Sequence, residues 1–428
     1  MIRIMKYGEE PNSAIFARST ATADVSGAVA EIIAAVRSEG DAALRRFEEA
    51  FDHVKLDALE VTAAEIEAAM AAVEPEFLEV LLKSTENIRA FHRRQLQNGY
   101  IMSETPGVIV GQRVIPLERV GICVPGSGSG TPLASTVLMN AVPAKLAGCG
   151  EVLMVTPAMP DGTVAPSLLA AAKLSGVDRI FKLGGAQAVA ALAYGTETVP
   201  RADKIVGPGG AYVAEAKKQV FGQAAIDMIA GPSEILVVSD GKSDPRYLAA
   251  DMLSQAEHDR NAAAVLVTDS MALAEAVQRE IEAQLPKLAR QEIARASVEQ
   301  NGKIIVTEDL KTAVAIANEI GPEHLELSLD DPFSWLEEIR HAGSVFLGRS
   351  CPEAMGDYYA GPNHTLPTGG TVRFSSPLGV EDFVKRSQFI YYTKDAQRAA
   401  AADVALFAEK EGLTGHARSA LIRTEEEK

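Results

Sequence analysis

After Gly107, short runs of Val, Ile and Leu alternate with Ala-rich segments of helical character. The runs typical of strands are 120–124, 152–155, 180–183, 204–206, 235–238, 264–267 and 304–306. Strands that are apolar along their whole length are typical of parallel sheets with helices on both faces. The alternation therefore predicts an α/β protein.

The hundred residues before this region are predicted to be mostly helical. Apolar residues recur at helical spacing over 25–36, and Gly40–Asp41 should end that helix and cap the next one. Thr62 and Glu65 have the spacing of a capping box, in front of a long helical stretch with an interruption expected at Pro75.

Two joints rich in Gly and Pro bracket one block of alternating strands and helices. They lie at 117–120 and at 231–234. Gly and Pro interrupt regular structure, so these joints are predicted to be a pair of domain boundaries. The length of 428 residues leaves room for two or three domains of about 150 residues each.

The chain is acidic, with 41 Lys and Arg residues against 58 Asp and Glu, a formal charge of −17. Such a charge repels nucleic-acid phosphates and anionic membranes, so neither is expected as a partner. The N-terminus lacks the apolar stretch of a signal peptide, and no run approaches the roughly 18 apolar residues of a membrane span. Cys123, Cys149 and Cys351 have no metal-ligand spacing and fit a reducing compartment. A cytoplasmic protein is predicted.

Glycine-rich turns follow three of the predicted strands, at 125–132, 184–187 and 207–210. Backbone N–H groups and the dipole of a following helix could hold an anion or a pyrophosphate there. The first turn does not have G-x-G-x-x-G spacing, and a flexible connection between strand and helix explains it equally well.

Four of the seven histidines stand beside a carboxylate or an amide near the predicted end of an element. These local pairings are Gln255 with His258, Glu323 with His324, Asp357 with His364 in the loop 356–364, and Glu411 with His416. A separation of three residues places Gln255 and His258 on one face of a helix. The other histidines, His53, His92 and His341, are interpreted as surface or packing residues.

Each of these pairings also has a purely structural interpretation, as an exposed polar face, an Asp-stabilised turn or a helix C-cap. Taken together, they offer oxygen and imidazole donors suited to a borderline cation such as zinc. A carboxylate and an imidazole are left over for proton transfer.

In combination, the segments 254–259, 321–325, 356–367 and 413–416 resemble the signature segments of the histidinol dehydrogenase family. The segments 137–145, 184–192, 226–238 and 342–348 also look like that family, in the family's order. The resemblance runs nearly from end to end, and its Gly-Pro-Asn-His-Thr-Leu-Pro loop at 361–367 is among its specific motifs.

The resemblance implies an enzyme that oxidises L-histidinol through the aldehyde to L-histidine with two NAD⁺, in the last steps of histidine biosynthesis. It also implies one zinc ion per subunit, whose ligands map onto Gln255, His258, Asp357 and His416. His324 would take the alcohol proton, and Glu323 would activate water at the aldehyde stage. The residues Ser233, Gln255, His258, His324, Asp357, His364, Glu411 and His416 match substrate-contacting positions.

The resemblance further implies two Rossmann-like, doubly wound domains in an aldehyde-dehydrogenase-like architecture, with a helical N-terminal segment and a C-terminal tail. The implied division is an N-terminal arm (1–21), a discontinuous domain with the zinc and acid/base residues (22–118 and 233–378), an inserted cofactor-side domain (119–232) and a tail (379–428). The tail would reach a partner subunit, so that Glu411 and His416 complete the neighbour's site in a homodimer.

The sequence departs from the family at the expected NAD site. Cys123 stands where the family usually has an aromatic residue, and Gly210 replaces an expected Asn. Gln187 is retained. The missing aromatic ring and amide would remove stacking and hydrogen bonds that contribute about 1 kcal/mol each.

Three alternatives remain beside this hypothesis. One is a paralogue that uses the same metal and NAD on another small amino- or hydroxy-alcohol. Another, of a different class, is a catalytically silent dimer that binds a metal or metabolite. A zinc hydrolase fits the ligand chemistry but leaves the paired α/β domains without a role.

Overall fold

A computed structural model describes residues 1–18, 24–126 and 131–425. The chain forms two compact units. The larger contains Met1–Gln95 and Leu117–Phe383, and the smaller contains Leu96–Pro116 and Val384–Lys428. The larger unit holds two parallel sheets, which confirms the predicted α/β class.

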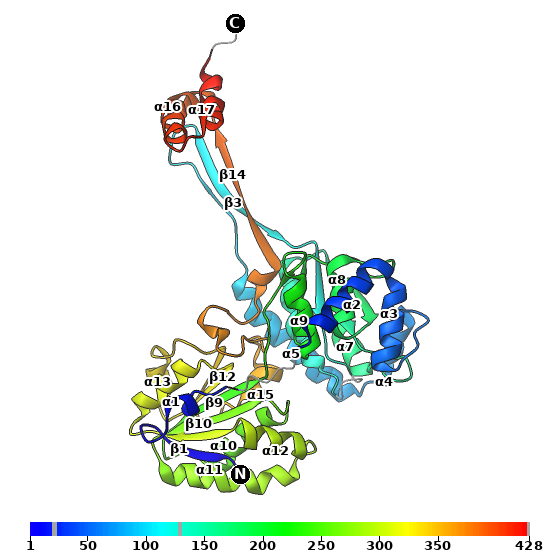
Figure 1. Cartoon of the computed structure of the whole chain (residues 1–428), viewed down its shortest axis with the longest axis vertical. Helices are drawn as coiled ribbons and strands as arrows, with labels where there is room; N and C mark the ends of the chain where they lie inside the picture. Colours follow the sequence, from blue (N-terminus) through cyan, green and yellow to red (C-terminus); the bar gives the residue numbers. More distant parts are fainter. Residues whose placement is uncertain (19–23, 127–130, 426–428) are drawn as a thin grey trace. The chain divides into compact units, whose positions relative to one another are not determined.

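The first sheet of the larger unit has six parallel strands. In spatial order they are β1 (Arg3–Lys6), β11 (Lys303–Val306), β10 (Ala263–Thr268), β9 (Glu234–Ser239), β12 (His324–Ser328) and β13 (Ser344–Leu347). Helices cover both faces (Figure 1). On one face lie α10 (Pro245–Ala256), α11 (Met271–Gln284) and α12 (Gln291–Gln300); on the other lie α1 (Asn12–Ile15) and α13 (Leu310–Ile320).

Successive side chains of these strands enter opposite cores, as the pleat of a strand requires. In β9, Ile235 and Val237 pack with α10 to α12, whereas Leu236 and Val238 pack with α13. This double burial explains why the strand reads as a continuous apolar run in the sequence.

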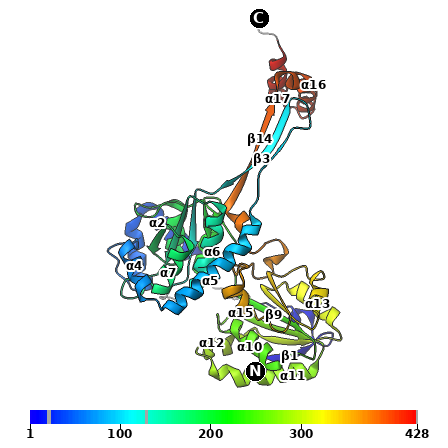
Figure 2. The same ribbon diagram turned by 180° about the vertical axis from the view of Figure 1, so that it is seen from behind.

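The second sheet of the larger unit has five parallel strands. Their order is β6 (Arg179–Lys182), β5 (Glu151–Thr156), β4 (Arg119–Cys123), β7 (Lys204–Val206) and β8 (Ala225–Ile226). One face packs against α2 (Ser26–Glu39), α3 (Asp41–Phe47), α8 (Gly185–Tyr194) and α9 (Ala211–Val220). On the other side lie α6 (Ala134–Ala147) and α7 (Pro166–Ser175), with α4 (Ala63–Ala72) and α5 (Pro75–His92) packed against them (Figure 2).

The N-terminal helices follow most of their sequence signals. Thr62 and Glu65 form the capping box in front of α4, and Pro75 is the first residue of α5. Asp41 is different, because its carboxylate does not cap α3. It accepts hydrogen bonds from Thr196 and Thr198 instead, since those hydroxyls reach it in the folded chain.

The packing differs from the domain division implied by the resemblance. Residues 3–6, placed in an N-terminal arm, form the edge strand β1 of the six-stranded sheet. Between 26 and 92, α2 and α3 pack on the five-stranded sheet, and α4 and α5 pack on its covering helices α6 and α7, rather than on the sheet of 233–378. The reason is that Val29, Ile32 and Val36 bury their side chains in the same core as the Ala-rich helix α8.

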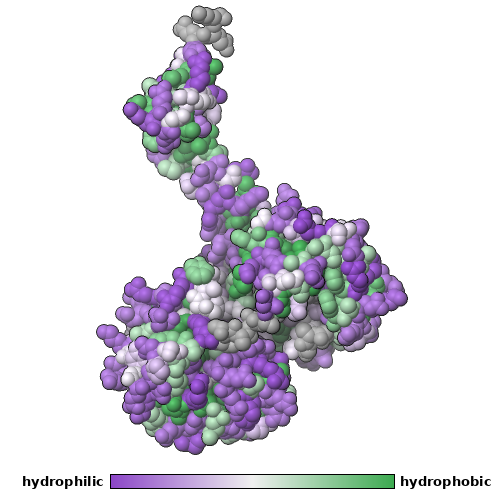
Figure 3. All heavy atoms as spheres, in the orientation of Figure 1, coloured by the Kyte–Doolittle hydropathy of each residue, from purple (hydrophilic) through white to green (hydrophobic). Residues whose placement is uncertain are grey.

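The smaller unit is an antiparallel sheet followed by two helices. Strand β3 (Val108–Pro116) lies between β2 (Tyr100–Met102) and β14 (Val384–Tyr392), and α16 (Lys394–Lys410) packs against α17 (Thr414–Leu421). Residues 100–116 were expected in the domain with 233–378, but 108–116 pair with 384–392, and 100–102 pair with 110–112. Many apolar side chains of this unit are exposed among hydrophilic ones (Figure 3), including Ile101, Ile390, Tyr391 and Phe407.

The short elements of the larger unit connect its main helices and strands. They are η1 (Glu48–Asp52), η2 (Arg93–Gln95), η4 (Leu285–Lys287), α14 (Phe333–Leu336), α15 (Glu353–Met355), η5 (Gly356–Ala360), η6 (Thr371–Arg373) and η7 (Val380–Phe383); the smaller unit ends with η8 (Ile422–Thr424). Among the described helices, none has the length and apolar character needed to cross a membrane. Cys123, Cys149 and Cys351 are free thiols.

Candidate active site

One cavity of the larger unit, of about 870 Å³, gathers most of the residues singled out in the sequence. Its lining includes Gly210, Ser233, Gln255, His258, Glu323, His324, Asp357 and His364. Of the glycine-rich turns, the described residue Pro125 and the turn 207–210 also line it, whereas 127–130 lie outside the described residues. The long-range folding of the chain therefore brings together side chains that the sequence scatters over more than a hundred positions.

Several of these candidate side chains converge at the amino edge of the six-stranded sheet. Ser233 precedes β9 directly, and Glu323 and His324 stand at the beginning of β12. Because β9 and β12 are parallel neighbours, with His324 opposite Ile235, the starts of the two strands lie side by side. Gln255 lies in the last turn of α10. His258 lies beyond the end of that helix, not on it as the spacing predicted.

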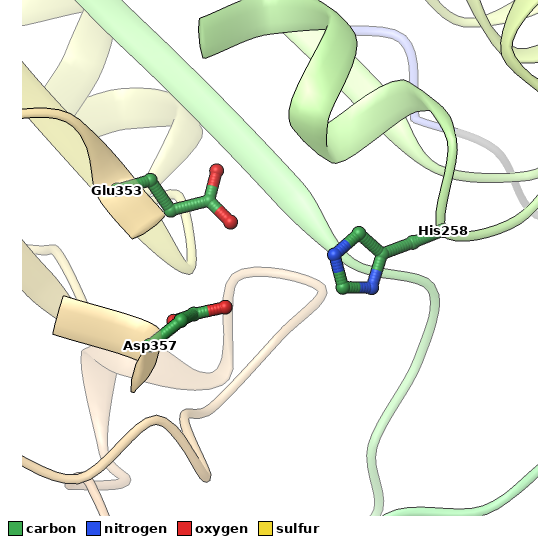
Figure 4. Close-up of side chains that lie close together, drawn as sticks. All are labelled: His258, Glu353 and Asp357. Atoms are coloured by element: carbon green, nitrogen blue, oxygen red, sulfur yellow. The ribbon is translucent and has the colours of Figure 1, made fainter. Parts of the chain in front are cut away.

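Three side chains form a cluster that could hold a metal ion. His258, Glu353 and Asp357 each offer one ligand atom, and these atoms lie within 4.8 Å of one another. Figure 4 shows the two carboxyl groups and the imidazole ring directed toward one another. Glu353 begins α15, and Asp357 follows four residues later in η5.

The fully buried Gln255 borders the same cluster. One atom of its carboxamide lies 3.1 Å from Oε2 and 3.3 Å from Oε1 of Glu353. Two buried carboxyl groups, an amide and an imidazole are a donor set suited to a borderline divalent cation. In the described parts of the chain, neither Glu353 nor Asp357 forms an ion pair with Lys or Arg. A bound cation would offset the charge of these buried carboxyl groups. The residues present therefore fit a divalent metal.

Glu323 is a buried carboxyl group held by backbone. Its Oε2 accepts a hydrogen bond of 2.9 Å from the backbone nitrogen of Glu234. Burial raises the pKa of Glu323 to about 8, although the charge of His324 opposes the shift. A carboxyl group with such a pKa exchanges its proton near neutral pH, as a general acid or base requires.

His324 is the second buried titratable group. Its Nδ1 lies 3.1 Å from the backbone oxygen of Glu234, and its Nε2 lies 3.4 Å from Oδ1 of Asp357 without forming a hydrogen bond. Burial lowers the pKa of His324, but the charges of Glu323, Glu353 and Asp357 outweigh burial and raise it to about 10. Because Nε2 forms no hydrogen bond within the described residues, it remains available to a bound molecule.

The other titratable groups of the cavity respond to the same surroundings. Burial lowers the pKa values of His258 and His364, so their rings favour the neutral form that can ligate a metal. Burial raises the pKa of Asp357, but the neighbouring histidines His324, His364 and His258 outweigh it and lower the pKa overall. Asp357 therefore remains a carboxylate.

Comparison with known proteins identifies the family. The profile described as histidinol dehydrogenase matches residues 16–424. The chain belongs to the histidinol dehydrogenase family. This membership makes it an NAD-dependent oxidoreductase.

Individual relatives agree with the family assignment. The chain is 55% identical to the histidinol dehydrogenase of Syntrophotalea carbinolica over 430 residues, with 99% of each chain covered. It is 52% identical to that of Geobacter sulfurreducens, with 96% of each covered. The crystal structure of histidinol dehydrogenase from Elizabethkingia anophelis superimposes with a TM-score of 0.93 at 36% identity, covering 99% of this chain and 98% of that one.

The residues that the family resemblance associates with NAD occupy different environments. Gly210 lines the cavity. The carboxamide of Gln187 is buried and donates a hydrogen bond of 2.9 Å to Oε1 of Glu48. Cys123 is buried at the end of β4, and burial raises the pKa of its thiol to about 12, which keeps it protonated.

Glu411 and His416 belong to the smaller unit. Glu411 caps the C-terminus of α16, and His416 lies in the first turn of α17. The larger unit alone therefore brings together Gln255, His258 and Asp357, but not the fourth residue of the implied ligand set.

Sequence reasoning missed two buried glutamates. Glu353 joins the cluster of His258 and Asp357, and Glu48 accepts a hydrogen bond from Gln187. Glu353 stands four residues before Asp357, a spacing that places two side chains on one face of a helix. That spacing is a signal, but acidic pairs four residues apart are common on exposed helices. Glu48 had no signal, because its partners Gly184 and Gln187 lie more than a hundred residues away.

Proposed function

We propose that this protein is a zinc-dependent histidinol dehydrogenase that converts L-histidinol, two NAD⁺ and water into L-histidine and two NADH through histidinal. The observation that supports this proposal best is the meeting of Gln255, His258 and Asp357 with Glu323 and His324 in one cavity. Relatives named histidinol dehydrogenase match this chain over nearly the whole length of both proteins.

The proposed zinc ligands are Gln255, His258, Asp357 and His416 of the partner subunit, with one ion per subunit. Bound zinc supplies a positive centre that anchors the amine and imidazole nitrogens of histidinol. The neutral ring of His258 suits metal binding, because a protonated imidazole cannot donate an electron pair. Ser233, His364 and Glu411 would contact the substrate beside the ligands.

His324 is the proposed base of the first oxidation. When unprotonated, its Nε2 accepts the hydroxyl proton while the carbinol carbon gives a hydride to NAD⁺. The raised pKa of His324 makes the neutral ring a strong proton acceptor. Contact between Nδ1 and the backbone oxygen of Glu234 fixes the orientation of the ring.

Glu323 is the proposed base of the second half of the reaction. As a carboxylate it takes a proton from the water that attacks histidinal, and the hydrate then gives a second hydride to another NAD⁺. The hydrogen bond from the Glu234 backbone fixes Oε2 of Glu323 beside the imidazole. Burial excludes bulk water, so the attacking water is one that the site positions.

The proposed cofactor site adjoins the turn 207–210. Gly207 to Gly210 follow the carboxyl end of β7, where open parallel sheets commonly bind nucleotides. Gly210 has open space where a side chain would begin, so the backbone there could approach a pyrophosphate closely. NAD binding through this turn and Gln187 does not require the aromatic ring that Cys123 replaces.

The smaller unit is proposed to pair with a second subunit in a homodimer. Its sheet and helices expose Ile101, Ile390, Phe407 and other large apolar side chains, and exposed apolar patches are typical of protein–protein contact sites. Pairing would bring Glu411 and His416 to the site of the neighbouring chain. We further propose a cytoplasmic location, in keeping with the three free thiols.

The decisive experiment follows NADH formation by the purified, zinc-loaded protein with L-histidinol and with a panel of other amino alcohols. We expect two NADH per histidinol consumed, and loss of turnover after zinc is removed by a chelator. Turnover with another alcohol alone would favour the paralogue. Zinc binding without any turnover would favour the silent binding dimer.

The shared site has its own test. Mixing a His258→Ala variant with a His416→Ala variant, after partial denaturation and refolding, should restore activity, because a mixed dimer then contains one site with both defects and one without either. Absence of restored activity in a mixture shown to contain mixed dimers would contradict a site shared between subunits.

A further inference from the structure

Glu353 is the buried residue of the site to which neither the resemblance nor the proposed reaction gives a role. Its side chain is only 2% exposed. Its position is well defined, because its backbone nitrogen donates a hydrogen bond of 2.8 Å to Oε1 of the buried Glu326. Helix α15, which begins at Glu353, follows Pro352, whose ring fixes the backbone entering the helix.

The carboxylate of Glu353 faces the carboxamide of Gln255. The terminal amide atom on that side lies 3.1 Å and 3.3 Å from the two Glu353 oxygens and 3.1 Å from Nδ1 of His324. The two Glu353 oxygens can accept hydrogen bonds, whereas Nδ1 of His324 donates to the backbone oxygen of Glu234. An amide nitrogen in this position is satisfied by the two carboxylate oxygens, whereas an amide oxygen would face two acceptors. The hydrogen-bonding pattern therefore assigns the NH₂ group to the side of Glu353.

This assignment determines where the other end of the amide lies. With the NH₂ group held by Glu353, the carbonyl oxygen is the other in-plane atom of the carboxamide and points away from the Glu353 oxygens. A metal accepts electron pairs from an amide oxygen and not from an amide NH₂ group. A glutamine can therefore serve as a ligand only when its NH₂ group has an acceptor elsewhere.

We propose that Glu353 is a positioning residue of the metal site: it accepts hydrogen bonds from the Gln255 NH₂ group and so fixes the carbonyl oxygen as the atom offered to the metal. This inference rests on the proposed function, since it assumes that Gln255 ligates zinc. It gives Gln255 the kind of outer partner that orients metal-bound histidines, where loss of the partner weakens metal binding about 10- to 100-fold.

The test compares zinc affinity in Glu353→Leu, Glu353→Gln and Glu337→Gln, measured by competition with a chromogenic chelator. Leucine removes the acceptor, so we expect about 10- to 100-fold weaker zinc binding. Glutamine keeps one oxygen that can accept from Gln255, so its loss should be clearly smaller. Glu337 is exposed, and its variant controls for the change in charge. Thermal unfolding of each zinc-free protein establishes that the variants are folded.

Two further measurements separate positioning from direct ligation. The cobalt-substituted Glu353→Gln protein should keep the wild-type visible absorption bands, because the ligands are unchanged. In a double-mutant cycle, Glu353→Leu should have little further effect in a Gln255→Ala background, because Glu353 acts through Gln255. Altered cobalt bands, wild-type zinc affinity in Glu353→Leu, or additive effects in the cycle would each overturn the proposal. Failure of the wild-type protein to bind zinc would instead overturn the proposed function on which it rests.

Discussion

The backbone nitrogen of Glu234 donates a hydrogen bond of 2.9 Å to Oε2 of Glu323. The two residues are 89 positions apart, and they meet because β9 and β12 are neighbours in a parallel sheet. The backbone oxygen of the same Glu234 lies 3.1 Å from Nδ1 of His324. One peptide segment at the start of β9 thus positions both members of the proposed acid/base pair.

Replacing Glu323 by Gln should slow the oxidation of histidinal far more than that of histidinol. The amide retains the shape of the carboxylate but cannot take a proton from water, and loss of a general base typically costs about 10²- to 10⁴-fold in rate. Rapid-mixing measurements with each substrate would separate the two halves. The exposed Glu308→Gln serves as the control. Equal slowing of both halves would contradict the role assigned to Glu323.

Replacing His258 by Ala should abolish stoichiometric zinc binding, because it removes an imidazole from the cluster with Asp357 and Glu353. Elemental analysis of the purified protein measures the metal content. A suitable control is His53→Asn, since His53 is exposed and its backbone has φ +57°, which Asn tolerates better than Ala. Unchanged zinc content would remove His258 from the ligand set.

Replacing Lys217 by Met should destabilise the larger unit by about 3–5 kcal/mol, because it leaves the buried carboxylate of Asp227 without an opposite charge. The two side chains form an ion pair and are 2% and 1% exposed. Both also hold Gly207, through its backbone oxygen and nitrogen, beside the proposed cofactor turn. Chemical denaturation measures the loss.

The exposed neighbour Lys218→Met is the matched control for Lys217. The double variant Lys217→Met, Asp227→Asn should be more stable than the sum of its two single effects predicts, because neither charge is then left alone. Strictly additive losses would show that the ion pair is not coupled.

Replacing Glu48 by Gln should stabilise the protein increasingly as the pH rises from about 4.5 to 8. Burial raises the pKa of Glu48 from 4.5 to about 8 in the folded chain. Between these values the folded state binds one proton more than the unfolded state, so the wild type loses up to about 1.4 kcal/mol of stability per pH unit. Glutamine carries no such penalty.

Denaturant unfolding of the wild type and Glu48→Gln at several pH values checks this expectation, with the exposed Glu49→Gln as control. A pH-independent difference between the wild type and Glu48→Gln would contradict it. The introduced glutamine would still offer an oxygen to the donors Gly184 and Gln187, so the comparison isolates the charge.

Much of the local structure could be predicted because its causes are local. The apolar runs that become β9 and β10 are buried on both faces, and the capping box of Thr62 and Glu65 satisfies backbone groups within one turn. Asp41 was predicted to be a cap by the same logic. That prediction was wrong, because Thr196 and Thr198 compete for its carboxylate from a distant part of the chain.

The sequence by itself determined the α/β class and the family, and it singled out candidate residues that line one cavity, because apolar periodicity, capping patterns and signature motifs are written in neighbouring positions. The tertiary structure decided which helices cover which sheet, that residues 108–116 pair with 384–392, and that Glu353 faces Gln255. These contacts depend on strand order and on the burial of whole faces. The free energy gained by burying whole faces arises only when distant segments meet, so no local sequence pattern encodes these contacts.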